Sequence, residues 1–389
     1  MQGKAPNSDL ALFLPDLHGG GAERMMLTIA RGLFEKGRRV HLILATARGA
    51  YLNEVPEGLN VIDLGARGVL ASFPRLVRTL RELNPTAVLG TLPYANLVLL
   101  WAARAANPQI RVYLREASTP SGVLREYKDP RTRAVMELAK VFFRRANGVV
   151  AVSGGVANDV HAYLNVPTEK IHLIYNPVVT PQLAQLAREP VEHRFFRTPG
   201  PTIVSAGRLG AEKDFPTLIR AFHRLRALRP EFAEAKLLIL GEGGERARLE
   251  RLAAQLRLGD SIDLPGFVPN PLPYMAGASV YALSSAREGL PGSLIQAMAC
   301  GTPVVSTDCP SGPSEVLDQG RYGPLVSVGD QEALASAIAR ALRSPLPPDR
   351  LIERAQHYSF ERSINQYDSL LLGGSHAVAG EGLANPAGD

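Results

Sequence analysis

The chain has 389 residues, more than one hydrophobic core usually organises and about right for two domains. Hydrophobic residues make up 46% of it and aromatic residues 6%, a globular composition with too few rings to favour a base-stacking nucleic-acid surface. The net charge of +6 comes from the first half, because residues 1–180 hold 22 basic and 14 acidic side chains and the remainder holds 21 and 23. Two cysteines make no disulfide framework, so we expect a reducing cytosol.

Short apolar runs alternate with amphipathic stretches through the first half of the chain. Buried strands are expected at residues 10–14, 40–45, 87–90, 110–114, 148–152 and 171–175. Helices are expected between them, for example at residues 23–36, 74–83 and 131–145. This alternation indicates an α/β fold with parallel sheets and helices on both faces. No apolar run reaches the length of a membrane span, and the short polar N-terminus is unlike a signal peptide.

A proline-rich stretch at residues 176–201 interrupts the alternation and predicts a linker with one short helix near residues 182–188. The pattern then restarts, with strands expected at 202–206, 236–240, 261–264, 279–283, 303–306 and 325–328, and helices at 216–229, 246–255, 294–300 and 332–342. A last helix is expected near 351–372. We therefore predict a first domain over 1–180, on which this helix packs, a linker over 181–200, a second domain over 201–350 and a disordered tail over 373–389.

Two open parallel sheets joined in this way are expected to enclose a cleft, with ligands bound beyond the carboxyl ends of the strands. The first loop at such a position contains Gly19, Gly20 and Gly21, which let the backbone approach a ligand before a helix begins. A dinucleotide fingerprint would need glycine at Arg24, and a second one, starting at Gly241, would need glycine at Arg246. No nucleotide-triphosphate phosphate loop occurs either, so NAD binding loses its main support and a tight strand–helix turn stays an alternative.

The second loop follows the first strand of the second half. Gly207 permits close approach, and Arg208 and Lys213 can converge on one anion, the arginine through bidentate contacts. A solvated surface pair is the alternative reading.

The third loop contains Glu288 in a turn shaped by Gly289, Pro291 and Gly292. Ser293 is expected to cap the helix that follows, whose N-terminus would form a second anion site, and Gln296 lies one turn inside that helix. A carboxylate and an amide that flank a phosphate site suit a sugar on one side and a ribose on the other, although Glu288 could also be a surface acid.

These loops together resemble those of the retaining glycosyltransferases of family four, the group one glycosyltransferases, which have the GT-B fold of two Rossmann-like domains. The resemblance covers nearly the whole chain and rests on these segments in order: Gly19-Gly-Gly-Ala-Glu-Arg24, Val150-Ala-Val-Ser153, Ile174-Tyr-Asn-Pro-Val178, Ala206-Gly-Arg-Leu209 with Lys213, Leu240-Gly-Glu-Gly243, Leu264-Pro-Gly-Phe267 and residues 284–312. The run Ser306-Thr-Asp-Cys-Pro-Ser-Gly-Pro-Ser-Glu315 is similar to a subset that extends lipid-linked oligosaccharides and surface polysaccharides.

The resemblance implies roles for particular residues. Arg208 and Lys213 would hold the donor diphosphate, and Glu288 would contact the donor hexose, which makes these three the expected catalytic set. The remaining donor-binding residues implied are Gly20, Gly21, Gly207, Gly241, Phe267, Val268, Gly289, Leu290, Pro291, Gly292, Ser293 and Gln296.

Two positions depart from the family pattern. Gln296 stands where the family has an acid that binds the ribose hydroxyls, so we expect weaker ribose binding, because charge-assisted hydrogen bonds are about twice as strong as neutral ones. Many relatives also carry a histidine near the strand at 110–114, where this chain has none. Arg115 or Glu116 could reach the acceptor side instead, together with Glu23, and core or surface roles for the first two stay open.

The implied activity is retaining transfer of a hexose or N-acetylhexosamine from a UDP-linked sugar to a glycan, glycolipid or lipid-linked acceptor. The nucleotide sugar is a co-substrate, with no cofactor, metal or nucleic acid expected. The basic first half makes peripheral contact with an anionic membrane a hypothesis for a protein expected in the cytoplasm at the inner membrane face, with a solvated basic surface as the alternative. A nucleotide-sugar epimerase and a catalytically silent nucleotide-sugar-binding partner are the rival functions.

Overall fold

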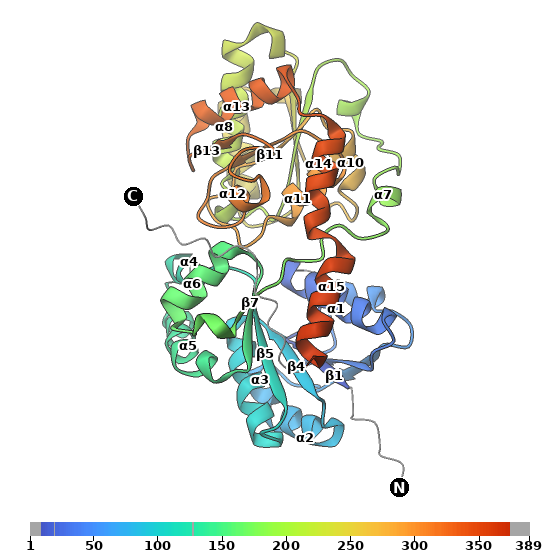
Figure 1. Cartoon of the computed structure of the whole chain (residues 1–389). Coiled ribbons are helices and arrows are strands. Elements are labelled where there is room, and N and C mark those ends of the chain that lie inside the picture. The colour runs from blue at the N-terminus through green and yellow to red at the C-terminus, as the bar shows by residue number, and fades with distance from the viewer. Residues whose placement is uncertain (1–8, 19, 127, 374–389) are drawn as a thin grey trace, which may run out of the picture. The chain divides into compact units, whose positions relative to one another are not determined.

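The computed structural model of the chain describes residues 9–18, 20–126 and 128–373 (Figure 1). These residues fall into two compact units. Unit 1 runs to Val152 and includes Val156–Tyr175 and the chain from Ser363, whereas unit 2 consists of Ser153–Gly155 and Asn176–Arg362. Each unit is built around one parallel sheet flanked by helices, which confirms the predicted α/β class.

The sheet of unit 1 has seven strands in the order β3-β2-β1-β4-β5-β6-β7. Its strands are β1 (Leu10–Leu14), β2 (Val40–Leu44), β3 (Asn60–Asp63), β4 (Ala87–Thr91), β5 (Arg111–Glu116), β6 (Gly148–Ala151) and β7 (Ile171–Leu173). The helices that connect them are α1 (Gly21–Glu35), α2 (Phe73–Leu83), α3 (Pro93–Ala106), α4 (Pro120–Glu126), α5 (Pro130–Phe142) and α6 (Gly154–Leu164).

Burial explains which of these strands the sequence predicts. Every residue of β1, β2, β4 and β6 is buried, so each appears as a continuous apolar run. The edge strand β3 has exposed residues at both ends and no such run, which is why it was not predicted. It pairs with β2, in parallel register.

The sheet of unit 2 has six strands in the order β10-β9-β8-β11-β12-β13. Its strands are β8 (Thr202–Ala206), β9 (Lys236–Leu240), β10 (Ile262–Gly266), β11 (Val280–Leu283), β12 (Val304–Thr307) and β13 (Leu325–Val326). The helices from Asn176 on are α7 (Leu183–Leu186), α8 (Phe215–Leu228), α9 (Arg246–Gln255), α10 (Leu272–Ala276), α11 (Gly292–Ala299), α12 (Pro313–Val316), α13 (Gln331–Arg343), α14 (Pro348–Ala355) and α15 (Phe360–Leu372), the last of which crosses into unit 1.

The core of unit 2 forms where α8 and α13 cover the sheet. Leu218, Phe222 and Leu225 recur at helical spacing on α8 and are fully or almost fully buried against Ile203 and Leu237 of the strands. This packing holds β8 and its neighbours rigidly, so the loops at their carboxyl ends begin from fixed positions.

The single helix predicted near residues 351–372 is wrong. The chain instead forms α14 and α15, separated by a 3-10 turn at Gln356–Tyr358 and an extended residue, Ser359. The break has a partner, because Val178 and Val179 both donate backbone hydrogen bonds to the Tyr358 carbonyl and Phe360 donates one back to Val179. Extended pairing with the preceding linker therefore outweighs helix propensity at this point.

The last helix turns are tied to unit 1. The Asp368 carboxylate accepts two hydrogen bonds of 2.8 Å from the Arg38 guanidinium, and the Leu371 carbonyl accepts one of 2.8 Å from Arg111. The short helix expected near residues 182–188 is α7. Of the tail predicted to be disordered, all but Gly373 lies outside the described residues.

The strand order of unit 2 creates a switch point next to β8. The chain moves from β8 outward to β9 and β10, then crosses back to β11 on the other side of β8. In open parallel sheets, loops diverge at such a point and leave a crevice at the carboxyl ends of the two strands. The loops after β8 and β11 are therefore the first place to look for a ligand site.

Candidate active site

The predicted site residues of unit 2 follow the carboxyl ends of four adjacent strands. Gly207 and Arg208 come directly after β8, Gly241 after β9, Phe267 and Val268 after β10, and Glu288 lies in the loop after β11. Because the four strands are parallel neighbours, these loops share one edge of the sheet. The sequence motifs are thus brought together by topology alone.

Lys213 and Glu288 form the centre of this edge. The Lys213 ammonium lies 2.5 Å from Oε1 of Glu288, and both side chains are largely buried. Ser285 donates a second hydrogen bond of 2.6 Å to the same oxygen. Burial by itself would lower the pKa of Lys213, but the Glu288 carboxylate outweighs it and holds that pKa above its usual value. The ammonium is therefore charged at neutral pH and available to an anion.

The backbone fixes the direction of Lys213. A 3-10 turn at Ala211–Lys213 ends at Asp214, whose φ of +44° lies in the left-handed region that short polar side chains tolerate. The Asp214 carboxylate accepts a 2.7 Å hydrogen bond from Thr217 at the start of α8. The Lys213 carbonyl in turn accepts 2.8 Å from Ser284, which ties the loop after β8 to the loop after β11.

Arg208 is the second cation at this edge and is mostly exposed. Its Nε and Nη2 donate to Oε1 of Glu212 at 3.0 and 2.7 Å. Sequence reasoning did not select Glu212, because an acid between two basic residues looks like an ordinary surface counter-charge.

Two glycines allow the loops after β8 and β9 to touch. A Cβ at Gly241, where φ is +144°, would lie 1.9 Å from the Gly207 carbonyl oxygen, so no other residue fits without a backbone shift. A Cβ at Gly207 would lie 3.2 Å from Cε of Lys213. Gly207 therefore lets the lysine side chain lie against the backbone on its way to Glu288.

The N-terminus of α11 lies directly after the Glu288 turn. The helix begins at Gly292, and its N-cap is Pro291, which provides no side-chain cap. The prediction that Ser293 caps this helix is wrong, since Ser293 lies inside it and its side chain interacts with the buried Tyr281 hydroxyl. Within the described chain, the backbone N–H groups of Gly292 and Ser293 have no acceptor. They present two donors and the positive end of the helix dipole to an anion.

Tyr281 is a further residue that sequence reasoning missed. It is fully buried on β11, and its hydroxyl donates to the Ala206 carbonyl at 3.2 Å as well as interacting with Ser293. The end of β8 and the beginning of α11 are thus braced by one phenol. The available signal was a polar aromatic residue inside an otherwise apolar strand.

The end of β12 and the loop after it hydrogen-bond to the turn that carries Glu288. Ser311 donates 3.0 Å to the Gly289 carbonyl, and Thr307 donates 2.6 Å to the Ser285 carbonyl. A Cβ at Gly312, where φ is +94°, would lie 2.5 Å from Cδ of Pro291, so only glycine allows this approach. The turn that carries Glu288 is therefore held on both sides.

The other predicted donor residues lie around the same turn. Leu290 and Pro291 are buried, and Gln296 is half-buried on α11. The Gln296 side chain makes no hydrogen bond to any described residue, so its amide is free for a ligand. Phe267 is exposed at the end of β10.

The site residues predicted in the first half belong to unit 1. Gly20 is the N-cap of α1, Gly21 is its first residue and Glu23 lies in its first turn, while Gly19 is outside the described residues. A Cβ at Gly20 would lie 2.1 Å from Oε2 of Glu23. Because Gly20 has no side chain, the Glu23 carboxylate can lie against the backbone at the start of the helix.

Arg115 and Glu116 lie at the end of β5 and are buried. Arg115 donates 3.2 Å to Thr91, and Glu116 accepts 2.9 Å from the Asn96 side-chain amide. Burial raises the pKa of Glu116 to about 8, although Asn96 and Arg115 oppose the shift. These contacts favour a role in the interior of unit 1, and a role toward an acceptor stays a prediction.

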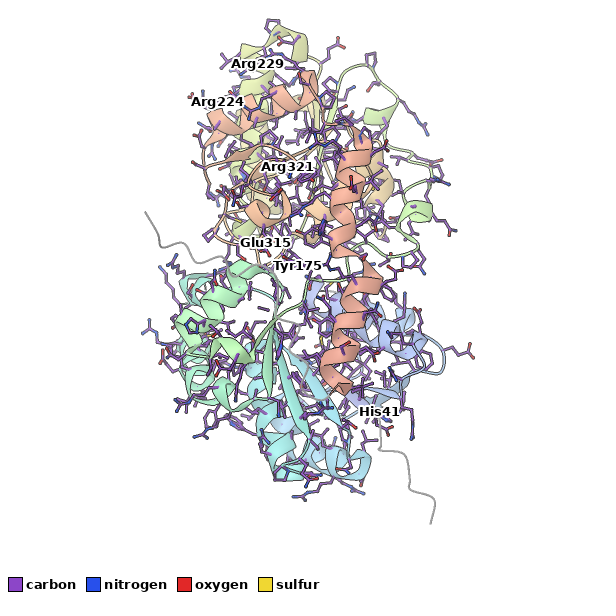
Figure 2. The ribbon with its side chains drawn as sticks, in the orientation of Figure 1. His41, Tyr175, Arg224, Arg229, Glu315 and Arg321 are labelled. Atoms are coloured by element: carbon purple, nitrogen blue, oxygen red, sulfur yellow. The ribbon has the colours of Figure 1, made fainter. Side chains whose placement is uncertain are left out.

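No group of three or more His, Cys, Asp or Glu that could hold a metal ion occurs among the described residues. His41 on β2, labelled in Figure 2, lies instead beside a single carboxylate, with Nε2 3.5 Å from Asp9, and its Nδ1 is 2.7 Å from the Asn60 amide. The two cysteines are free, and burial raises the pKa of Cys300 to about 11 and that of Cys309 to about 12. Neither thiol is a thiolate at neutral pH.

Two family models match consecutive parts of the chain. The model of the Glycosyltransferase Family 4 matches residues 19–182, and that of the Glycosyl transferases group 1 matches residues 191–358. The second match spans all four loops of the unit 2 site. The chain belongs to the group 1 glycosyltransferases. The predicted family is confirmed.

Curated relatives cover most of the length of this glycosyltransferase. It is 28% identical over 354 residues to the N-acetylgalactosamine-N,N'-diacetylbacillosaminyl-diphospho-undecaprenol 4-alpha-N-acetylgalactosaminyltransferase of Campylobacter jejuni, covering 88% of this chain and 91% of that protein. It is also 28% identical over 359 residues to the lipopolysaccharide core biosynthesis glycosyltransferase LpsE of Rhizobium meliloti, covering 90% and 96%.

Solved structures share the fold at lower identity. Anabaena HepE in complex with UDP and glucose matches with a TM-score of 0.76 at 19% identity, covering 94% of this chain and 99% of that one. WaaG, a glycosyltransferase involved in lipopolysaccharide biosynthesis, matches with a TM-score of 0.72 at 16% identity, covering 94% and 100%. These matches confirm the predicted GT-B fold. In the part of the chain that the structure describes, no helix has the length and apolarity to cross a membrane.

Proposed function

We propose that this glycosyltransferase moves a hexose or N-acetylhexosamine from a UDP-linked donor to a lipid-linked or glycan acceptor, with retention of configuration and without a metal. The observation that carries the proposal is the buried pair of Lys213 and Glu288 beside the uncapped N-terminus of α11. A cation, a carboxylate and two free backbone donors at one edge of the sheet suit a sugar joined to a diphosphate.

The donor diphosphate would be bound by three groups. Arg208 offers a bidentate guanidinium, Lys213 a compact charge, and the first N–H groups of α11 fixed dipoles. The hexose would then lie against Glu288. UDP is the proposed nucleotide because a structure of the same fold, Anabaena HepE, contains UDP and glucose.

The acceptor class is proposed from the relatives. One is named for transfer to an undecaprenol-diphosphate-linked sugar and another for lipopolysaccharide core biosynthesis. A lipid-linked or lipopolysaccharide-type glycan is therefore the proposed acceptor for this chain. Its exposed basic helix α5 would hold the enzyme near an anionic membrane that contains such acceptors.

The mechanism follows from where charge develops. When the bond between the sugar and the diphosphate breaks, negative charge grows on the leaving phosphate oxygens. Lys213, Arg208 and the α11 dipole would stabilise that charge, which is the main source of catalysis in such a site. In retaining transfer the acceptor hydroxyl attacks from the face that the nucleotide leaves. The raised pKa of Lys213 keeps its ammonium charged through this step.

A transfer assay with Lys213→Ala tests the proposal. We expect turnover to fall on the order of a hundredfold or more, since removing one preorganised contact to a developing anion costs about 3–4 kcal/mol. Arg78→Ala, which removes a cation paired with Glu82 on the surface of unit 1, is the control and should retain normal turnover. Near-normal turnover of Lys213→Ala would overturn the assigned role.

Product analysis separates the rival functions. A transferase gives a glycosylated acceptor with the donor's anomeric configuration, an epimerase releases an altered sugar without any acceptor, and a silent partner binds the nucleotide sugar without turnover. Activity should also be unchanged by EDTA. Inhibition by EDTA that added Mg²⁺ or Mn²⁺ restores would contradict the metal-independent mechanism.

A further inference from the structure

Glu212 lies between the two cations of the donor site and contacts both sides of it. Its side chain accepts the Arg208 guanidinium at 3.0 and 2.7 Å. Its backbone carbonyl accepts the Ala286 N–H at 2.9 Å and the Arg287 N–H at 3.4 Å, directly before Glu288. One residue thus links Arg208 to the turn that carries the sugar-side carboxylate.

The carboxylate of Glu212 has a shaped place in the loop. A Cβ at Gly210 would lie 2.3 Å from Oε2 of Glu212, so glycine at this position leaves room for the acid. The Glu212 side chain is 13% exposed, whereas that of Arg208 is 64% exposed. The acid is therefore the fixed member of the pair and the guanidinium the one that can move.

In the donor-free site Arg208 is paired with Glu212, and Lys213 is paired with Glu288. A nucleotide diphosphate brings further negative charge to the same edge of the sheet, where these cations can bind it. Solvent screens the exposed Arg208 end of its ion pair and weakens the pair, whereas a guanidinium binds phosphate in a bidentate, charge-assisted way. Arg208 can therefore exchange Glu212 for the diphosphate.

We propose that Glu212 is a positioning residue that competes with the nucleotide diphosphate for Arg208. It orients the guanidinium in the donor-free enzyme and takes it back when the nucleotide leaves. The inference rests on the proposed function, since it assumes that the diphosphate binds at Arg208. Glu212 lowers the affinity for donor and for nucleotide product, and in exchange it speeds release of the product.

Calorimetric titration with UDP tests this competition in the full chain. We expect Glu212→Gln to tighten UDP binding about fivefold, the effect of removing one ion pair with a solvent-exposed guanidinium that opposes binding. In an Arg208→Ala background, Glu212→Gln should have no effect on UDP affinity, because the guanidinium for which Glu212 and UDP compete is absent. The KM for donor should fall in Glu212→Gln, while kcat stays constant or decreases as product release slows.

Two further variants serve as controls. Glu82→Gln removes the acid of an Arg–Glu pair with the same four-residue spacing on α2, and UDP affinity should not change. Glu212→Ala should tighten UDP binding like Glu212→Gln, since both leave the backbone contacts to Ala286 and Arg287 in place. Equal melting temperatures would show that the variants fold like the wild type.

The outcomes distinguish a failure of the role assigned to Glu212 from a failure of the proposed donor site. Unchanged or weaker UDP binding in Glu212→Gln, or a gain that persists with Arg208→Ala, overturns the role of Glu212 while UDP binding itself supports the donor site. If the wild type binds none of UDP, ADP, GDP and CDP, both proposals fail.

Discussion

Gln296 lies where the sequence resemblance predicts an acidic residue that binds the ribose. Its half-buried side chain lies one helical turn after the start of α11, and it makes no hydrogen bond to any described residue. An amide accepts a ribose hydroxyl through its neutral carbonyl, whereas a carboxylate would give a charge-assisted bond.

Gln296→Glu should therefore tighten nucleotide binding. We expect the Kd for UDP to fall about fivefold, since a hydrogen bond to a charged group contributes roughly 1 kcal/mol more than a neutral one. Uridine, which has the ribose but no phosphate, is titrated in parallel as the control. Its affinity should rise as well, because the new carboxylate is expected to bind the ribose. A gain for UDP without any gain for uridine would assign the effect to the phosphates and contradict the ribose role.

Glu116 gives unit 1 a pH-dependent stability. Its side chain is 2% exposed, and its pKa of about 8 lies above the ordinary value of 4.5. The folded state therefore binds this proton more tightly than the unfolded state does. Stability from this group is complete below about pH 4.5 and is lost as the pH rises through about 8.

Glu116→Gln should remove that dependence, because the amide keeps the shape without a titrating proton. The difference in unfolding free energy between mutant and wild type should grow between pH 5 and pH 8, by at most about 1.4 kcal/mol per pH unit for one proton. Urea unfolding at several pH values measures it. Glu137→Gln, on the exposed face of α5, is the control and should give a constant difference.

At the scale of elements, continuous burial decided what the sequence could predict. Strands β1, β8 and β9 and helix α9 were predicted with the bounds that the structure has. Strand β3 was missed because it is half-exposed, and the break between α14 and α15 was missed because its cause is a long-range pairing with Val178 and Val179. Local patterns carry no information about such a partner.

The site divides in the same way. Arg208, Lys213 and Glu288 were found because glycines and prolines mark their loops. Tyr281 and Glu212 were missed, because each contacts a segment far away in sequence, Tyr281 at Ala206 and Glu212 at Ala286. Ser293 was predicted to be the N-cap because the helix was expected to begin at residue 294, whereas it begins two residues earlier, at Gly292.

Helix α5 is the element that we expect to meet a membrane. Arg131 and Arg133 are exposed, as are Leu138 and Val141, so this helix presents both basic and apolar side chains to solvent. Each basic residue near an anionic surface contributes about 1 kcal/mol. Arg131→Gln with Arg133→Gln should therefore weaken binding to phosphatidylserine vesicles on the order of tenfold.

Vesicle flotation measures this effect. Arg224→Gln with Arg229→Gln removes the same charge from unit 2, where Figure 2 labels both residues, and should leave binding unchanged. Equal losses in the two double variants would point to net charge and not to α5. Wild-type protein that floats equally with neutral vesicles would also contradict an electrostatic contact.

At the scale of the whole molecule, two units with separate sheets should respond differently to the donor nucleotide. The groups proposed to bind the diphosphate all belong to unit 2 and follow β8 and β11. A ligand that binds only the folded state raises the free energy of unfolding by about 2.7 kcal/mol at a concentration of a hundred times its Kd. The gain applies to the part of the chain whose unfolding destroys the binding site. UDP should therefore raise the melting temperature of the transition in which unit 2 unfolds.

Hydrogen exchange followed by mass spectrometry can locate that gain. With UDP, exchange should slow most in the segment from Gly207 to Lys213 and in the segment from Glu288 to Ser293, which carry the groups proposed to bind the diphosphate. The strand β3, at the far edge of the other sheet, serves as the internal reference and should exchange at the same rate with and without UDP. The assigned donor site is wrong if UDP protects neither segment of unit 2 at a concentration that raises the melting temperature.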